Sequence, residues 1–148
     1  MIKLLAVLAA LVSFNTQSIE LVYGLNTSHL KSGNYTQNGE TEKYNENNRF
    51  IAIQHSGYGL ARFTNSFNLD SEMIYKTEPI YTKSLGLFSV TGAISYGLIT
   101  GYPDALISDK YMPLLSPSLR VESKRGFLGM GLYGPLLDVL TVQIGFTL

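Results

Sequence analysis

The sequence predicts an all-β fold, an eight-stranded antiparallel transmembrane β-barrel over residues 19–148. Three observations lead to this prediction. An export signal precedes the first strand-like segment. Charged residues make up only 15% of the chain, against roughly 25% in soluble domains, although tyrosine is abundant. No later stretch is apolar and long enough for a membrane helix, which leaves short alternating strands to span a bilayer.

Residues 1–18 have the features of a secretory signal peptide. Lys3 supplies a positive charge, an unbroken apolar run follows over residues 4–12, and polar residues come next. The apolar run is too short to cross a bilayer, which takes roughly 20 residues. The small residues Thr16 and Ser18 fit cleavage before Ile19. The alternative is an N-terminal helix that is buried or anchors the protein in a membrane.

Composition excludes several classes of function. The chain has no cysteine, so neither disulfides nor a cysteine-based metal site holds the fold. Its formal net charge is zero and it has no basic cluster, which argues against a nucleic-acid partner. Histidines at metal-ligand spacing are also missing. We therefore expect no metal and no cofactor.

The first expected strand, residues 19–26, shows the alternation typical of a barrel wall. Glu20, Gly24 and Asn26 fall on one face and apolar residues on the other, with Val22 as the exception. The polar face would look into the lumen. The same reasoning gives seven further strands: 50–55, 58–64, 71–77, 87–101, 111–122, 127–133 and 139–148.

Long and short connections are expected to alternate along the chain. Ser56-Gly57 has the signature of a two-residue hairpin, Glu78-Pro79 begins another turn, and residues 123–126 form a charged turn. Residues 30–49 are polar and read as a loop without regular structure, and a loop this long is functional or mobile. Glycines expected on inward faces would leave room in the lumen: Gly86, Gly92, Gly97, Gly129, Gly131 and Gly145.

One end of the predicted barrel gathers the candidate chemistry. His29 ends the first strand beside the long loop, on the same rim as Asn65 and Ser66, whereas His55 lies at the opposite end. A histidine that reaches a serine hydroxyl is the minimal equipment for acyl transfer. Glu46 would orient His29 as a third group does in triads. The plain alternative is that all these side chains are only solvated.

Several short motifs in this order resemble the lipid A palmitoyltransferase family of bacterial outer-membrane enzymes. That family has Trp-His at the end of its first strand, Tyr-Asn-Glu in its first loop and Lys-Asp-Ser-Trp-Asn after its third strand. The corresponding segments here are Ser28-His29, Tyr44-Asn45-Glu46 and Asn65-Ser66-Phe67-Asn68. Tyr111-Met112-Pro113-Leu114 and Tyr133-Gly134-Pro135 resemble the family's Tyr-Ile-Pro segments. The match is spread over most of residues 19–148.

The resemblance implies an acyltransferase of the bacterial outer membrane that moves a palmitoyl chain from a phospholipid to lipid A. His29, Asn65 and Ser66 stand where the family has its required His, Asp and Ser, with Tyr44, Asn45 and Glu46 in support. Asn65 departs from the family, because an amide cannot act as a base or hold a negative charge, although it can hydrogen-bond. Ser66 either becomes acylated or only positions the donor. We expect a monomer.

Three prolines are candidates for a lateral gate. The family has prolines beside two lateral openings, and only those of the second have counterparts here: Pro113, Pro117 and Pro135. Proline has no N–H, so it would weaken the ladder of a closed barrel and leave a seam through which an acyl chain could pass. The alternative is a bulge outside the bilayer. The family's N-terminal amphipathic helix has no counterpart before Ile19.

Two other functions compete with acyl transfer. A small outer-membrane barrel of structural or adhesion type is favoured by the Asp-to-Asn difference at Asn65, and it predicts a tightly filled lumen. A lipid A deacylase would share the substrate and the membrane. Its usual His-x-Ser motif has no counterpart here, because no histidine follows His55.

Overall fold

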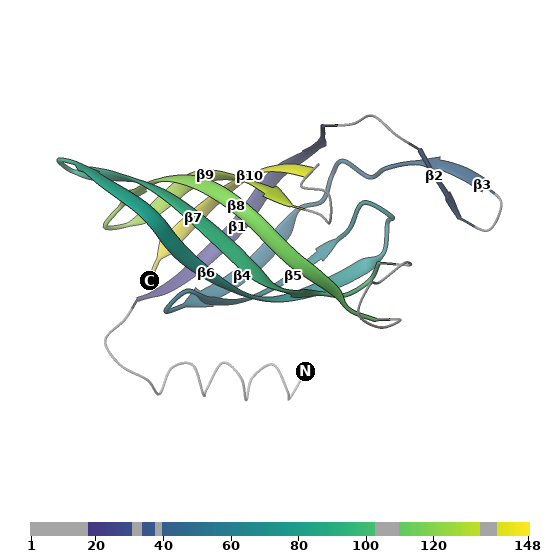
Figure 1. Ribbon diagram of the computed structural model, residues 1–148, viewed down its shortest axis with the longest axis horizontal. Coiled ribbons are helices and arrows are strands. Elements are labelled where there is room, and N and C mark those ends of the chain that lie inside the picture. Colours follow the sequence, from purple (N-terminus) through teal and green to yellow (C-terminus); the bar gives the residue numbers. More distant parts are fainter. Residues whose placement is uncertain (1–17, 31–33, 38–39, 103–109, 134–138) are drawn as a thin grey trace.

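The computed structural model describes residues 18–30, 34–37, 40–102, 110–133 and 139–148, and these residues form strands and connections without a helix. Eight strands close into one antiparallel barrel (Figure 1). Within the described ranges, no helix is long and apolar enough to cross a membrane. In their order around the barrel the strands are β1 (Ile19–His29), β4 (Phe50–His55), β5 (Tyr58–Thr64), β6 (Asp70–Leu85), β7 (Phe88–Ile99), β8 (Met112–Ser123), β9 (Gly126–Tyr133) and β10 (Val139–Thr147).

The predicted eight-stranded antiparallel barrel is thus confirmed as a fold. Two of the predicted features involve residues that the structure does not describe. Most of the expected signal peptide, residues 1–17, and Pro135, within residues 134–138, lie outside the described residues.

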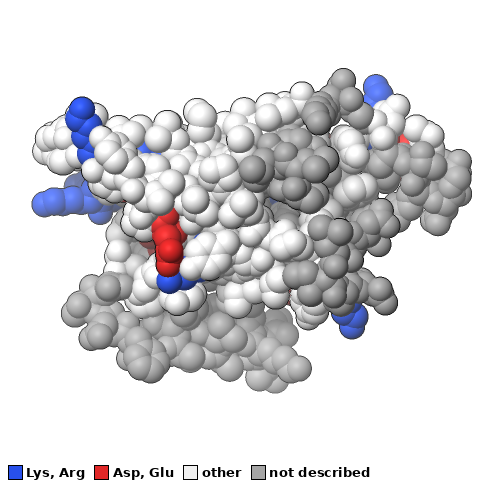
Figure 2. Space-filling model, in the orientation of Figure 1, with Lys and Arg blue, Asp and Glu red and all other residues white. Residues whose placement is uncertain are grey.

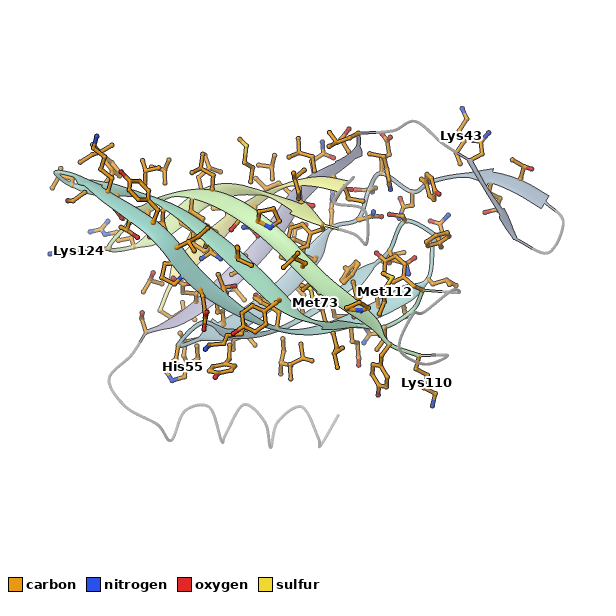
Figure 3. The ribbon with its side chains drawn as sticks, in the orientation of Figure 1. Lys43, His55, Met73, Lys110, Met112 and Lys124 are labelled. Atoms are coloured by element: carbon orange, nitrogen blue, oxygen red, sulfur yellow. The ribbon has the colours of Figure 1, made fainter. Side chains whose placement is uncertain are left out.

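The two ends of the barrel differ in their connections. At the turn end, short hairpins join β4 to β5, β6 to β7 and β8 to β9. Ser56 and Gly57 both have positive φ, 53° and 81°, as the predicted two-residue hairpin requires. β1, β5, β7 and β9 end at the opposite end of the barrel, which we call the loop end. Lys43 and Lys110 lie at the loop end, and His55 and Lys124 lie at the turn end (Figure 3).

The β6–β7 hairpin corrects the predicted turn at Glu78-Pro79. β6 continues through Pro79 to Leu85, and the hairpin extends beyond the other turns at that end (Figure 1). β5 pairs with β6 only as far as Tyr58 and Lys76, so this part of β6 is an edge. A proline is tolerated there because its missing N–H faces no neighbouring strand.

The loop predicted over residues 30–49 is only partly irregular. It contains a second, two-stranded sheet formed by β2 (Asn34–Gln37) and β3 (Glu40–Lys43). This hairpin projects from the loop end of the barrel (Figure 1). The segment Tyr44–Arg49 then runs without regular structure into β4.

A bulge in β1 reverses the expected inward and outward faces near the loop end. Gly24 pairs with Gln143 and Asn26 with Val142, so Leu25 is an extra residue relative to β10. Val22 and Gly24 face inward before the bulge, whereas Thr27 is buried and Asn26 is exposed after it. The expectation that Asn26 faces the lumen is therefore wrong, and the bulge directs Thr27 inward.

The lumen is filled rather than hollow. Buried apolar side chains from most strands form one cluster, which includes Phe50, Met73, Tyr75, Leu114 and Phe127. Other atoms occupy the space that the predicted glycines were expected to leave. Aromatic rings lie against Gly131 and Gly145, the Arg120 side chain lies against Gly129, and the backbone of β6 lies against Gly97. The expectation fails at Gly86 because it lies in the turn between β6 and β7. It fails at Gly92 because its neighbours Thr91 and Ala93 are buried, so Gly92 faces outward.

Candidate active site

His29 and Ser66 meet at the loop end of the barrel. His29 is the last residue of β1, and Ser66 lies in the turn between β5 and β6. The Nε2 atom of His29 lies 2.9 Å from the Oγ atom of Ser66, although the two residues are 37 positions apart. Ser66 is buried and His29 is half-buried. The structure therefore brings these two predicted site residues into hydrogen-bond contact.

Asn48 is a second partner of Ser66. Its Nδ2 atom donates a hydrogen bond to Ser66 Oγ at 3.1 Å, and Asn48 is only 5% exposed. Because an amide nitrogen only donates, the hydroxyl proton of Ser66 is free to point at His29 Nε2. The contact takes this direction in the His29 tautomer whose proton is on Nδ1.

Thr27 holds the segment that carries Asn48. Its Oγ1 donates to the backbone oxygen of Glu46 at 2.6 Å and accepts from the backbone N–H of Asn48 at 3.2 Å. The sequence reasoning missed both Thr27 and Asn48. The only signals were that Thr27 lies two residues before His29, on the same face of a strand, and that Asn48 follows the Tyr-Asn-Glu motif closely.

Asn65 is adjacent to Ser66 but serves the turn instead of the histidine. It is fully buried, with 0% exposure. Its Oδ1 accepts from the backbone N–H groups of Phe67 and Leu69, and its Nδ2 donates to Ser71 Oγ and to the Gly101 carbonyl oxygen. Its four side-chain hydrogen bonds are thus made within the turn, to β6 and to the residue that follows β7 and Thr100. Asn65 fixes the backbone that presents Ser66.

Tyr44 and Asn45 also contact the site. The ring of Tyr44 stacks on the ring of His29, with centroids 4.8 Å apart and an interplanar angle of 15°. Asn45 joins the two loops, since its backbone N–H donates to the Ser66 carbonyl and its Nδ2 to the Asn65 carbonyl. These contacts position His29 against Ser66.

Glu46 contributes its backbone and not its carboxylate. The side chain is exposed, while the carbonyl oxygen accepts from Thr27. No carboxylate among the described residues hydrogen-bonds to His29, and the buried Nδ1 atom of His29 has no partner there. The side-chain arrangement is therefore a serine–histidine dyad with an asparagine donor, not a triad. Buried polar atoms without a partner are uncommon, and a catalytic role is one of the recognised reasons for them.

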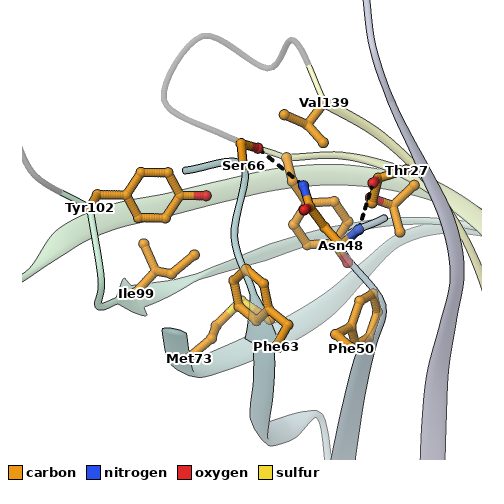
Figure 4. Close-up of a pocket in the computed structure, with 11 residues that line it drawn as sticks. Thr27, Asn48, Phe50, Phe63, Ser66, Met73, Ile99, Tyr102 and Val139 are labelled. Carbon is orange, nitrogen blue, oxygen red and sulfur yellow. Dashed lines mark hydrogen bonds between the residues drawn. The ribbon is translucent and has the colours of Figure 1, made fainter. Parts of the chain in front are cut away.

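A pocket lies next to Ser66, in the part of the lumen nearest the loop end (Figure 4). Thr27, Asn48 and Ser66 supply its polar rim (Figure 4). Most of its wall is apolar, and the remaining lining residues are Phe50, Phe63, Met73, Ile99, Tyr102, Tyr133, Val139 and Thr141. The Oγ atom of Ser66 thus lies at the edge of a mostly apolar cavity.

Two seams in the barrel wall open towards the loop end. β8 pairs with β9 only from Ser118 to Ser123, so Met112–Pro117 has a ladder on the β7 side alone. Pro113 and Pro117 both fall in this unpaired part. β1 pairs with β4 only from Ile19 to Tyr23, which leaves the rest of β1 without a β4 partner although no proline is present. The sequence reasoning missed this second seam.

Metal ligands do not gather at the site. Across the described ranges, no group of three or more histidine, cysteine, aspartate or glutamate side chains is placed to hold a metal ion. The chemistry available at this rim is that of a hydroxyl, an imidazole and an amide.

Comparison of the chain with protein-family models, with curated proteins and with solved structures gives no match.

Proposed function

We propose that the protein is an outer-membrane acyltransferase that moves a fatty acyl chain, palmitoyl in the family it resembles, from a phospholipid to lipid A. The observation that carries the proposal is the contact of Ser66 Oγ with both His29 Nε2 and Asn48 Nδ2, at the mouth of an apolar pocket. A hydroxyl hydrogen-bonded to an imidazole is an activated nucleophile. An apolar pocket beside it suits a lipid ester better than a soluble, polar one.

The first half of the reaction transfers the acyl group to Ser66. His29 Nε2 takes the hydroxyl proton while Ser66 Oγ bonds to the carbonyl carbon of the donor ester, and the carbonyl π electrons move to the carbonyl oxygen. The tetrahedral intermediate then re-forms the carbonyl and breaks the ester C–O bond. The protonated His29 gives its proton to the departing lysophospholipid alkoxide.

The second half of the reaction releases the acyl group to the acceptor. A hydroxyl of lipid A loses its proton to His29 as its oxygen bonds to the acyl carbon, and the bond from that carbon to Ser66 Oγ breaks. Ser66 regains a proton from His29, so both residues return to their starting state. The second N–H of Asn48 Nδ2 is available to the developing oxyanion in both halves, which is the role of an oxyanion-hole donor.

The outer face of the barrel supports a location in a membrane. The side chains on this face are mostly apolar, and lysine, arginine, aspartate and glutamate are sparse on the face seen in Figure 2. Exposed large apolar residues occur on most strands: Leu21, Tyr23, Leu25, Ile51, Ile74, Tyr96, Leu98, Leu115, Leu119, Val121, Leu128, Met130 and Phe146. Such a face costs free energy in water and is typical of a barrel in lipid.

Charges on this face gather on β5 and β6. Arg62 pairs with Asp70 near the loop end, and Lys76 pairs with Glu78 close to the β4–β5 turn. Ile74 lies between the two ion pairs. The charges of this wall therefore lie on both sides of Ile74 along β6.

Lipid extraction from bacteria that express the protein tests the proposal. Lipid A from cells with the wild type is expected to gain an acyl chain by mass spectrometry, and cells with Ser66→Ala or His29→Ala are expected to lack it. His55→Ala is the matched control, because His55 lies at the other end of the barrel. Unchanged lipid A with the wild type, or equal product from Ser66→Ala, would overturn the proposal.

A structural or adhesion role is the second candidate, and the filled lumen favours it. Aromatic and polar side chains occupy most of the interior, as such a role predicts. Under this role, Ser66→Ala and the wild type would give identical lipid A, and the contacts among His29, Asn48 and Ser66 would only stabilise the loops. The same extraction therefore separates the two candidates.

A further inference from the structure

We infer that the acyl chain of the donor stays out of the lumen and leaves the pocket sideways, between β1 and the segment that leads into β4. The rate of the reaction should then depend little on the length of the acyl chain. This inference rests on the proposed function and adds where the hydrocarbon lies during the reaction. It follows from the size of the pocket, from what fills the lumen below it and from the unpaired part of β1.

The pocket below Ser66 is too small for a fatty acyl chain. Its volume is about 40 Å³. At roughly 10–15 Å³ for each water-sized group, that volume takes about three such groups, enough for the ester and the first carbons only. The rest of the chain must therefore continue elsewhere.

Aromatic rings close the lumen beneath the pocket. The ring of Phe50 lies on Gly24, the ring of Tyr75 on Gly59 and the ring of Phe127 on Gly145, each so close that a Cβ on the glycine would overlap the ring. All three aromatic residues are buried, at 7%, 7% and 5% exposure. Rings seated directly on backbone leave no channel between them for a hydrocarbon chain.

A polar layer lies among and below these rings. Gln54 Nε2 donates to Glu20 Oε2 at 3.2 Å, and Thr91 Oγ1 donates to Glu122 Oε2 at 2.8 Å. The Arg120 side chain lies 4.0 Å from Glu122 and is 8% exposed. Pushing hydrocarbon into this layer would strip charged groups of their remaining solvation, which is costly.

The seam beside β1 offers the way out. The β1–β4 ladder ends at Tyr23 and Ile51, and beyond it the two walls are joined through Thr27. Thr27, Asn48 and Phe50 line the pocket, and they also flank this seam, whereas no β8 residue lines the pocket. The seam is therefore preferred over the one between β8 and β9.

Apolar side chains continue this path on the outer face of the barrel. Leu25, just beyond the end of the β1–β4 ladder, is 42% exposed, and Ile51, in the last pair of that ladder, is 54% exposed. A chain that passes between them stays in contact with apolar surface and, in a membrane, with lipid. The part of the acyl chain beyond the seam then lies outside the barrel, where the protein does not limit its length.

A donor series tests the inference. Full-length protein in detergent is given synthetic phosphatidylcholines of a single chain length, from octanoyl to stearoyl, and lysophospholipid is measured by mass spectrometry. Rates are expected to agree within about threefold, whereas a closed apolar pocket discriminates by about tenfold or more for one methylene group. Phe127→Leu, which widens the lumen, is expected to leave the profile unchanged.

A pair of tryptophan variants tests the path itself. Leu25→Trp, at the seam, is expected to slow the reaction by about tenfold or more, because small displacements of a reacting group are costly. Leu128→Trp is the matched control, since Leu128 is equally outward-facing on β9 and is 55% exposed.

Each outcome of these experiments has a distinct meaning. A sharp optimum at one length, an optimum that moves in Phe127→Leu, or equal slowing by both tryptophan variants overturns the inference and leaves acyl transfer standing. If no donor gives more lysophospholipid than Ser66→Ala does, the proposed function is overturned, and the inference with it.

Discussion

The Nε2 atom of His29 and the Oγ atom of Ser66 lie 2.9 Å apart, at the mouth of an apolar pocket. If this contact carries acyl transfer, removing either partner should remove the activity. Ser66→Ala and His29→Ala are each expected to lower kcat by about 10³-fold or more. The barrel should stay folded in both variants, although each loses the hydrogen bond between His29 and Ser66 and Ser66→Ala also leaves Asn48 Nδ2 without this acceptor. Lysophospholipid release measures the activity, and a variant that keeps more than a tenth of it would contradict the role of that residue.

Asn48 should matter through its N–H donor. Asn48→Asp keeps the shape but places an acceptor against Ser66 Oγ, which would draw the hydroxyl proton away from His29. We expect kcat to fall by about 10²–10³-fold, the usual effect of losing an oxyanion-hole donor, with KM nearly unchanged. Asn47→Asp is the matched control, because the Asn47 side chain is exposed. Equal kcat values for the two variants would leave Asn48 with no part in the chemistry.

Asn65 should respond as a structural residue, even though the resembling family has Asp at this place. In Asn65→Asp a carboxylate oxygen would face the Gly101 carbonyl, which now accepts from Nδ2 at 2.6 Å. We expect the free energy of unfolding to fall by about 1–3 kcal/mol, the cost of leaving buried polar groups unpaired. Activity should fall as Ser66 loses its fixed position.

Denaturation in urea compares Asn65→Asp with Asn68→Asp. Asn68 has a φ of 57°, a conformation that aspartate also adopts, so this control should be nearly neutral. If Asn65→Asp were as stable as the wild type and more active, position 65 would be a catalytic position at which asparagine supports less activity than aspartate.

Gly24 should tolerate no side chain. A Cβ there would overlap the ring of Phe50, which both fills the lumen and lines the pocket. Gly24→Ala is expected to cost about 1–3 kcal/mol, as overpacking of a core usually does. Gly92→Ala is the matched control, because a Cβ at Gly92 meets nothing within 4 Å. Thermal melts in detergent compare the two, and equal melting temperatures would show that the lumen can give way at Phe50.

The strands of the barrel could be predicted from local signals because those signals act locally. Ser56-Gly57 allows only a tight turn between two alternating segments, and the structure has that turn. Pro79 misled the prediction, since a proline usually ends a strand. It lies within β6 because β5 ends at Tyr58 and offers no partner to the missing N–H. The sequence of a strand does not determine whether a neighbouring strand pairs with it at a given residue.

The site could be predicted only in part for the same reason. His29 and Ser66 were found because an imidazole and a hydroxyl on one rim suggest chemistry by their type. Asn48 and Thr27 carry no such signal, and their contacts depend on how residues 44–49 lie along β1. Asn65 and Asn48 are the same residue type, but the amide of Asn65 hydrogen-bonds to Phe67 and Gly101, whereas the amide of Asn48 hydrogen-bonds to Ser66.

By itself, the sequence determined that the chain forms eight alternating strands, with long connections at one end and tight turns at the other. Alternation and turn chemistry are properties of neighbouring residues, so they can be read without the fold. Only the tertiary structure decided which residues beyond Gly24 face inward. Side chains alternate with a period of two, so the single extra residue at Leu25 exchanges the two faces of β1. Strict alternation from Val22 and Gly24 would have placed Ser28 on the inward face. Because the pairing with β10 contains the bulge, Thr27 and His29 are on that face instead.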